Sequence, residues 1–546
     1  MKTRLTHFII ASLLSTLIFG CGGSSGTSSA ASSTTGSKRP LISGGSYLAT
    51  WQYGNMRDGS NSNETTLTIS NVNKTSFGRL FTQALDAITL GQPLYVPSVK
   101  IKGVVHNTVY VCTENNSVYA FDADSNTGSN AQPLWKVNLG PAAPLGTEDA
   151  GNEPLDGILS TPVIQYTVGT TATGVLYVCD KTMTSGTFHY TLHGLDITTG
   201  SETAGGPEPI AATVPGKLGP ITLDVKNSYQ RPALLLNNNT VYVAIGGQAK
   251  DPEPDRGWVV GFNASNIKLQ TAAFTSCADL ADSSTPEKGG AFWMSGAGPA
   301  CDGTSIYLTT GNGDFNANTG GADYGDSILK LNSSLKVTSY FSPFNTTYLE
   351  DHDLDLGCGG PILIPSQAGS PPLLLQESKT NELYIANTNS LGGFNATTDQ
   401  IYQEEPLGLN REYLCTCAYC NGYVYLIRGY SLQEYAIKTG KLQSKPSATA
   451  STVFGAAYSP TPVVSYSGNS TPVVWAMQEY GSTAILHAFD AVALREIYNS
   501  GQDAPRDAAG KFTKFAVPLV MAGKVYVPCA NEIAVYGLLS SPAQRR

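Results

Sequence analysis

The segment Val109-Tyr110-Val111, followed by Val118-Tyr119-Ala120-Phe121-Asp122, contains the pattern that decides the fold of this chain. Both runs are rich in β-branched and aromatic residues, and the second alternates small and large side chains, which predicts two adjacent β-strands. A proline before an aliphatic residue, Pro93-Leu94, opens the unit. The three sub-motifs together predict one strand–turn–strand repeat.

The same sub-motifs recur along the whole chain. The proline sub-motif stands at Pro93, Pro162, Pro232, Pro299, Pro361, Pro462 and Pro518, and the β-branched/tyrosine run contains Tyr110, Tyr177, Tyr242, Tyr307, Tyr425 and Tyr526. A degenerate unit over residues 423–437 has the strands without the proline, and it brings the predicted number of repeats to eight.

Repeats made of strands cannot bury their faces alone, so neighbouring repeats must stack. A closed ring of four-stranded sheets protects the edges of so many strands. We therefore predict an all-β fold, an eight-bladed β-propeller of four-stranded antiparallel blades. Residues 77–85 read as a strand that precedes the first repeat, and we expect this N-terminal strand to pair into the last blade and close the ring.

Composition restricts the function. The chain of 546 residues has 41% hydrophobic and only 14% charged residues, with 57 glycines and 28 tyrosines, as short strands and tight turns require. Its net charge of −9 gives no basic footprint, so we expect no nucleic-acid partner.

The N-terminus has the features of a targeting segment. Lys2 and Arg4 precede an apolar run over residues 8–19, which is too short to span a bilayer. Ile18-Phe19-Gly20-Cys21 resembles the lipobox of bacterial lipoproteins, which implies cleavage before Cys21 and lipid on that cysteine. An ordinary secretory signal with an incidental cysteine is the alternative.

These features predict four segments: a lipoprotein signal peptide (1–20), a Gly/Ser/Thr-rich tether (21–46), the propeller (47–540) and a disordered tail (541–546). The lipid would hold the chain in the cell envelope. Gly22 after the anchor favours the outer over the inner membrane, with the domain facing either the periplasm or the cell surface.

Nine cysteines remain besides Cys21. Cys277 and Cys301, 24 residues apart, could close a disulfide loop, whereas Cys112, Cys179 and Cys529 follow predicted strands as small buried residues. Cys415, Cys417 and Cys420 form a C-x-C-x2-C cluster that could ligate a metal, but no fourth ligand is near in the sequence. We expect a disulfide or buried thiols there instead.

Residues 118–123, Val-Tyr-Ala-Phe-Asp-Ala, resemble the repeat of the pyrroloquinoline quinone (PQQ) propeller superfamily. The segments Trp51-Gln52-Tyr53-Gly54-Asn55 and Arg57-Asp58-Gly59 are similar to its opening segment, and the resemblance spans residues 47–540. It implies one of two kinds of protein. One is the quinoprotein alcohol dehydrogenases, eight-bladed periplasmic enzymes with PQQ and calcium on the axis, and the other is the non-catalytic propeller lipoproteins that scaffold outer-membrane protein assembly.

The resemblance to the dehydrogenases implies specific site residues. Thr309-Thr310-Gly311-Asn312 is similar to a stretch whose Asn ligates calcium, and Tyr324-Gly325-Asp326-Ser327 resembles a Gly-Asp-Asn turn. Ser342-Pro343-Phe344-Asn345 resembles the element that supplies the catalytic base, but the aspartate is replaced by Asn345, and an amide cannot act as a general base. Asp351, Asp353 and Asp355 are possible substitutes.

Other parts of the dehydrogenase pattern are missing. The chain has no adjacent cysteine pair for the ring disulfide, and residues 179–195 lack the calcium-binding glutamate. Two aromatic patches, Arg256-Gly257-Trp258 and residues 292–296 with Trp293, could stack on a ligand or pack blade against blade. Asn312, Asp326 and Trp293 are therefore the candidate cofactor-binding residues if the chain is an enzyme.

The sequence favours a non-catalytic binding or scaffold protein, with no cofactor and with an envelope protein as partner. The loops over residues 141–159, 200–228 and 248–255 are the candidate partner surfaces. Two alternatives remain: a PQQ- or calcium-dependent oxidoreductase with altered catalytic groups, and a surface carbohydrate- or matrix-binding protein.

Overall fold

The structure is a computed structural model that describes residues 46–145, 154–247, 255–280, 289–408, 416–455 and 460–540. The predicted signal peptide, Cys21, nearly all of the predicted tether and the predicted tail lie outside the described residues. Within the described ranges, no helix is both long and apolar enough to cross a bilayer.

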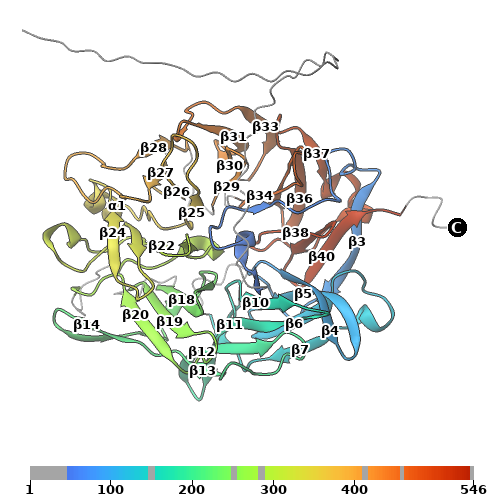
Figure 1. Ribbon diagram of the computed structural model, residues 1–546, viewed down its shortest axis with the longest axis horizontal. Helices are drawn as coiled ribbons and strands as arrows, with labels where there is room; N and C mark the ends of the chain where they lie inside the picture. Colours follow the sequence, from blue (N-terminus) through green and yellow to red (C-terminus); the bar gives the residue numbers. More distant parts are fainter. Residues whose placement is uncertain are drawn as a thin grey trace, which may run out of the picture. The chain divides into compact units, whose positions relative to one another are not determined.

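The strands form antiparallel sheets that follow one another in chain order around a common centre (Figure 1). The first two repeats share one sheet, joined by a parallel bridge between Val99 and Ala172. Its strands are β1 (Ser46–Ala49), β4 (Leu94–Ile101), β5 (Val104–Cys112), β6 (Ser117–Asp122), β7 (Trp135–Asn138), β10 (Val163–Val168), β11 (Ala172–Thr184), β12 (Thr187–Asp196) and β13 (Glu208–Pro209).

Each later repeat forms a sheet of its own. The third and fourth are β16 (Ser228–Tyr229), β17 (Leu235–Asn237), β18 (Thr240–Gly247), β19 (Trp258–Asn263) and β20 (Gln270–Thr275), then β21 (Ala300–Cys301), β22 (Ile306–Thr309), β23 (Ile328–Leu331) and β24 (Val337–Phe341). The fifth and sixth are β25 (Ile362–Ile364), β26 (Leu373–Glu377), β27 (Glu382–Asn387) and β28 (Gln403–Pro406), then β29 (Ala418–Cys420), β30 (Tyr423–Arg428), β31 (Ser431–Lys438), β32 (Lys441–Leu442) and β33 (Ala448–Val453).

The last two sheets each include an N-terminal strand. They are β2 (Ser60–Asn61) with β34 (Val463–Ser465), β35 (Val473–Tyr480), β36 (Thr483–Asp490) and β37 (Glu496–Asn499), and β3 (Phe77–Ala84) with β38 (Leu519–Met521), β39 (Lys524–Pro528) and β40 (Glu532–Leu538). Outside the sheets lie the pairs β8 (Ala143–Pro144) with β9 (Leu155–Asp156) and β14 (Thr213–Gly216) with β15 (Gly219–Thr222), and the helices α1 (Thr346–Asp351) and α2 (Ala504–Asp507). Single 3-10 turns are η1 (Trp51–Tyr53), η2 (Gly128–Ala131), η3 (Met294–Gly296), η4 (Ala317–Thr319) and η5 (Ser500–Asp503).

The predicted all-β class is confirmed, and the degenerate unit over 423–437 contains β30 and β31.

The tyrosine in the second strand of most repeats joins its repeat to the next one by a hydrogen bond. Its hydroxyl donates to a backbone oxygen just beyond the third strand of the following repeat. These bonds join Tyr110 to Ile197, Tyr177 to Ala264, Tyr242 to Ser333 and Tyr425 to Ala491. Tyr307 is the exception and donates to Asp302 within its own repeat.

The last repeat contacts the first in the same way. The hydroxyl of Tyr526 donates to the backbone oxygen of Ala123 at 3.1 Å. Val109 and Phe121 of the first repeat share one buried apolar cluster with Val525 of the last. In addition, β3 pairs with β40 over its whole length, with Phe77 opposite Leu538 and Ala84 opposite Glu532. The two ends of the series of repeats are therefore packed against each other.

Residues 50–61 lie in the middle of the sheets (Figure 1) and bond to strands or strand-flanking residues of seven repeats. The contacts run from Gln52 N to Gln92 Oε1, Asn55 Nδ2 to Leu236 O, Cys301 N to Asn55 O, Leu363 N to Met56 O, Tyr419 N to Asp58 O, Val464 N to Gly59 O and Asn61 Nδ2 to Val520 O. We call residues 50–61 the hub segment. It stabilises the sheets jointly, because each contact reaches a different repeat.

Arg57 is the largest polar side chain in the hub segment, and it is fully buried. Its guanidinium donates to the backbone oxygens of Pro299, Leu234 and Trp51, each at 3.0 Å, and to Thr50 Oγ1 at 2.8 Å. Burial of a charge is tolerated only when its hydrogen bonds are satisfied, and these four bonds meet that requirement.

Cys277 and Cys301, whose spacing could close a disulfide loop, are both free and buried in the structure. Cys277 comes two residues after β20, the outermost strand of its sheet, whereas Cys301 lies in β21, the first strand of the next sheet. Cys417 and Cys420 are also free and buried, in two different apolar clusters, and Cys415 lies outside the described residues.

Candidate functional site

The loop after β22 places Asn312 between two carboxyl groups. Its backbone N–H donates to Asp355 Oδ1 at 3.0 Å, and its side-chain Nδ2 donates to Asp326 Oδ2 at 3.1 Å. The side-chain oxygen Oδ1 is buried and has no hydrogen-bond partner among the described residues. Two of the three candidate residues from the sequence, Asn312 and Asp326, are thus in direct contact.

Asp326 has an unusual environment. Its backbone is in the left-handed region with φ 43°, a conformation that costs energy for a residue other than glycine. Its carboxyl group is fully buried and also accepts the N–H of Leu356 at 2.9 Å. Burial, reinforced by the nearby charge of Asp355, raises the pKa of Asp326 well above its ordinary value. Burial therefore shifts the ionisation equilibrium of Asp326 towards the uncharged carboxyl.

Asp355 is paired with a lysine of the same chain. Lys379 Nζ lies 2.6 Å from Asp355 Oδ2 and 3.4 Å from the exposed carboxylate of Asp353. Burial alone would lower the pKa of Lys379, but the attraction of Asp355 and its hydrogen bond raise that pKa above its ordinary value. The ammonium group is therefore charged at neutral pH, and it neutralises the Asp355 carboxylate.

Trp293 packs against the same loop. A Cβ added to Gly311 would lie 2.6 Å from Trp293 Cδ1 and 2.3 Å from Asp355 Oδ1, so only glycine permits this approach. Met294 and Ser295, which follow the tryptophan, both have positive φ. Strained residues of this kind often cluster at functional sites.

A cation lies beside the tryptophan ring. The Arg231 guanidinium carbon is 5.9 Å from the ring centroid of Trp293, 4.6 Å from that of Tyr229 and 6.0 Å from that of Phe515. The candidate site therefore combines an aromatic surface and a guanidinium with the Asn312–Asp326–Asp355–Lys379 network. Among the described residues of this network, both carboxyl groups, Asp326 and Asp355, are hydrogen-bonded within the chain.

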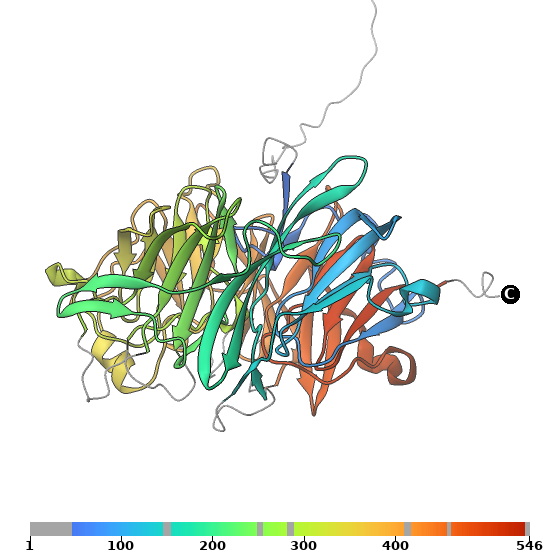
Figure 2. The ribbon, with the colours of Figure 1, turned by 90° about the horizontal axis from the view of Figure 1, so that it is seen from below.

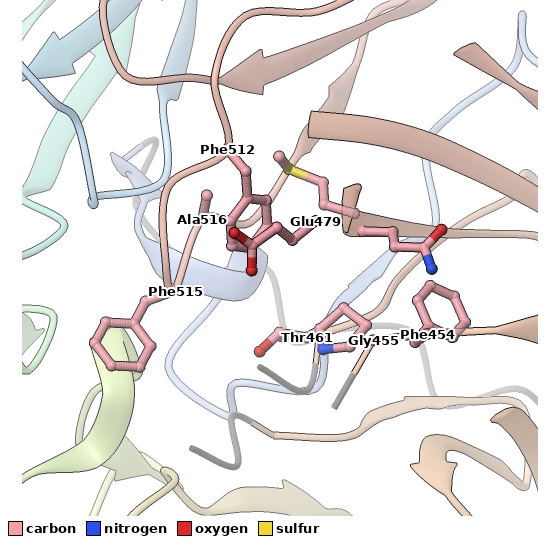
Figure 3. Close-up of a pocket in the computed structure, with 10 residues that line it drawn as sticks. Phe454, Gly455, Thr461, Glu479, Phe512, Phe515 and Ala516 are labelled. Atoms are coloured by element: carbon pink, nitrogen blue, oxygen red, sulfur yellow. The ribbon is translucent and has the colours of Figure 1, made fainter. Parts of the chain in front are cut away.

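The small pocket in Figure 3 lies next to this aromatic group, because Phe515 belongs to both. Its volume is about 40 Å³. The residues that line it are Phe454, Gly455, Pro460, Thr461, Met477, Gln478, Glu479, Phe512, Phe515 and Ala516. Pockets for cofactor-sized ligands have volumes of roughly 300 Å³ or more, so this one admits only water-sized groups.

Other residues singled out from the sequence lie elsewhere. Asn345 precedes α1, where its backbone oxygen accepts the N–H of Leu349, and Asp351 ends that helix and is exposed. Asp355, rather than Asn345, is the residue that meets Asn312. Trp258 is buried in the apolar cluster between sheets, as expected for blade packing. Of the candidate loops, residues 146–153 and 248–254 lie outside the described residues.

Sequence reasoning missed Lys379 and Arg231. For Lys379, its position in the repeat could have indicated the contact. Lys379 lies two residues beyond β26 and Asn312 three residues beyond β22, so each follows the second strand of its repeat. Because equivalent ends of adjacent repeats lie close together in a stacked fold, polar residues at that position in neighbouring repeats are expected to meet.

Calcium and PQQ, which the family resemblance implies, can be tested against these residues. The unpartnered Asn312 Oδ1 would suit a calcium ion, which takes six to eight oxygen ligands. However, both oxygens of Asp326 and of Asp355 are already hydrogen-bonded, and a lysine occupies the side of Asp355. In the described parts of the chain, no three His, Cys, Asp or Glu side chains gather as a metal site would require. The residues as arranged do not fit a calcium site.

Comparison with known proteins supports the fold. No family model matches the chain, and no curated protein matches it in sequence. The solved structures that are similar to the chain include three dehydrogenases. A quinohemoprotein alcohol dehydrogenase from Pseudomonas putida HK5 aligns with TM-score 0.56 and 13% identity over 90% of this chain and 80% of its own. The enzyme of the same kind from Comamonas testosteroni gives 0.53 and 12% over 89% and 80%. A europium-containing methanol dehydrogenase gives 0.52 and 13% over 90% and 98%.

These similarities confirm the resemblance to the PQQ-repeat propeller superfamily as a likeness of fold. At 12–13% identity they carry no statement about activity.

Proposed function

We propose that the chain is a lipid-anchored protein of the cell envelope that acts by binding other molecules, with no redox catalysis of its own. Its repeats would form an eight-bladed ring, one blade per repeat, in which β3 completes the last blade. The bond from Tyr526 to Ala123 and the cluster shared by Val109 and Val525 support this closure.

The pair between Lys379 and Asp355 is the observation that carries the non-catalytic assignment. An oxidation catalyst of the quinoprotein kind needs a carboxylate that can accept the substrate's proton. Here Lys379 Nζ lies 2.6 Å from Asp355 Oδ2. Burial raises the pKa of the second carboxyl group beside Asn312, that of Asp326, well above its ordinary value.

The β14–β15 hairpin is the partner surface that we favour. It lies within the loop predicted over residues 200–228, and it forms a separate two-stranded sheet. Ile221 and Leu223 anchor it in a buried apolar cluster, while Leu218 at its turn is 75% exposed. Leu218 is therefore the position at which we expect a partner to contact this hairpin.

Site-specific photo-crosslinking in intact cells tests the binding role. A photoreactive residue at position 218 should give one discrete adduct with an envelope protein, which mass spectrometry can name. Leu269, also an exposed leucine at 54%, provides the matched control position. Equal adduct patterns at both positions, or none at either, would contradict the assignment of this hairpin.

A PQQ- or calcium-dependent oxidoreductase is the second candidate. The unpartnered Asn312 Oδ1 favours it, since a buried acceptor without a donor is the kind of group that a ligand satisfies. Dye-linked alcohol oxidation that requires added PQQ and calcium, and that Asn312→Ala abolishes, would support this candidate over the binding role.

A further inference from the structure

Two hairpins extend beyond the rest of their sheets on the side where the described chain begins. The ends of the β4–β5 and β10–β11 hairpins are joined by the parallel bridge between Val99 and Ala172. Strand β1 pairs with β10 along the same edge, and Figure 2 shows the end of the β10–β11 hairpin standing out beside β1. We call this surface, formed by residues 46–49, 99–106 and 166–173, the hairpin face.

The hairpin face exposes large apolar side chains. Val104 and Val105 at the turn of the first hairpin are 57% and 54% exposed, and Val168 at the end of the second is also exposed. Tyr47 lies opposite Tyr166 in the register, with the two rings stacked at a centroid separation of 5.4 Å. Val168 is two residues beyond Tyr166 and so points to the same side of the sheet.

The charge of the hairpin face is opposite to that of the whole chain. Residues 46–49, 94–112 and 163–175 contain no Asp or Glu, whereas Lys100 and Lys102 are exposed beside Val104. Two carboxylates contact this hairpin from outside it, and both are engaged: Asp122 accepts from His106 Nδ1 at 2.7 Å, and Asp124 accepts from Asn107 Nδ2 and pairs with Lys524. A local charge of about +2 on a chain of net charge −9 indicates a surface adapted to an anionic partner.

We propose that the hairpin face docks on the headgroup region of an anionic bilayer. This inference rests on the lipid anchor of the proposed function. Strand β1 begins at Ser46, 25 residues after Cys21, so a lipid on Cys21 would be joined to the described chain at the hairpin face. Exposed apolar side chains flanked by lysines suit the boundary between headgroups and acyl chains, where both kinds of group are favourable.

The test uses the full chain, purified from membranes and reconstituted in vesicles of phosphatidylethanolamine and phosphatidylglycerol. Val104→Cys is labelled with an environment-sensitive fluorophore, and nitroxide-labelled lipids act as quenchers. All cysteines in the described residues are buried, which favours labelling at the introduced position. Val492→Cys is the matched control, because Val492 is a valine of similar exposure at 67% on the β36–β37 turn.

Quenching at position 104 should exceed quenching at 492 at least two-fold. In the background of Lys100→Gln and Lys102→Gln the difference should shrink, as it should in vesicles of phosphatidylcholine alone. Equal quenching at both positions in a vesicle-bound chain would overturn the docking proposal while leaving the anchor intact. If the chain purified from membranes carries no lipid on Cys21 and does not float with vesicles, both the anchor and the docking are overturned. The unlabelled Val104→Cys chain is also checked for a disulfide-linked dimer. Such a dimer, together with no quenching of the labelled chain, would overturn the lipid assignment and identify the hairpin face as a self-association surface.

Discussion

Replacement of Arg57 by methionine should show how strongly the hub segment stabilises the fold. Methionine keeps much of the apolar length but removes all four hydrogen bonds, so the backbone oxygens of Pro299, Leu234 and Trp51 lose a buried donor. Each buried acceptor left without a partner costs about 1–3 kcal/mol, and removal of the buried charge recovers part of this loss. We expect the free energy of unfolding to fall by about 3 kcal/mol.

The assay is urea-induced unfolding of the two proteins, followed by intrinsic fluorescence. Arg495→Met is the control, because the Arg495 side chain is 75% exposed and only 3.6 Å from Asp490 Oδ2, a geometry worth less than about 1 kcal/mol. If Arg57→Met changes the unfolding free energy by no more than Arg495→Met does, the reasoning that the hub segment joins the sheets is refuted.

Three further predictions concern the repeats, pH and the thiols. Tyr177→Phe and Tyr526→Phe should each lower the free energy of unfolding by about 1–2 kcal/mol, because each removes a buried bond between repeats. Tyr307→Phe should cost less, because its bond to Asp302 lies within one repeat; equal losses for the three would argue against the inter-repeat role. Burial lowers the pKa of His193, but hydrogen bonds to Asp180 and Glu202 outweigh it and raise that pKa to about 9. The resulting stabilisation is complete below about pH 6.5 and is lost as pH rises through 9, so stability should fall over this window by up to about 3 kcal/mol in the native chain. His193→Gln should flatten that slope, and an unchanged slope would contradict the assignment. Alkylation of the unreduced, unfolded chain should modify both Cys277 and Cys301, as mass spectrometry can establish; a peptide that links the two would contradict the structure.

The strands were predictable because their periodicity is local, as the second-strand tyrosines show. The hydrogen-bond partners of those tyrosines were not predictable. The Tyr177 hydroxyl donates to the backbone oxygen of Ala264, 87 residues further along the chain, and this sequence separation depends on the lengths of the loops. The motif Trp51-Gln52-Tyr53 was recognised, but its position among the sheets follows only from the assembled fold.

The candidate site was predicted in part for the same reason. Asn312 and Asp326 lie 14 residues apart in one repeat, and a motif could identify both. Lys379 follows β26 of the next repeat, and Asp355 lies in the loop that leads into β25 of that repeat, so no motif of the Asn312 repeat could identify the lysine. The spacing of Cys277 and Cys301 suited a disulfide loop, but β20 and β21 lie in different sheets, which spacing alone cannot reveal.

A titration of the purified full chain with PQQ in the presence of calcium, read by calorimetry and by cofactor absorbance, tests the central claim most directly. Since Lys379 neutralises Asp355 and burial shifts Asp326 towards its uncharged form, we expect no saturable binding in the native chain. Saturable uptake of one PQQ with calcium, lost in Asn312→Ala, would contradict the account.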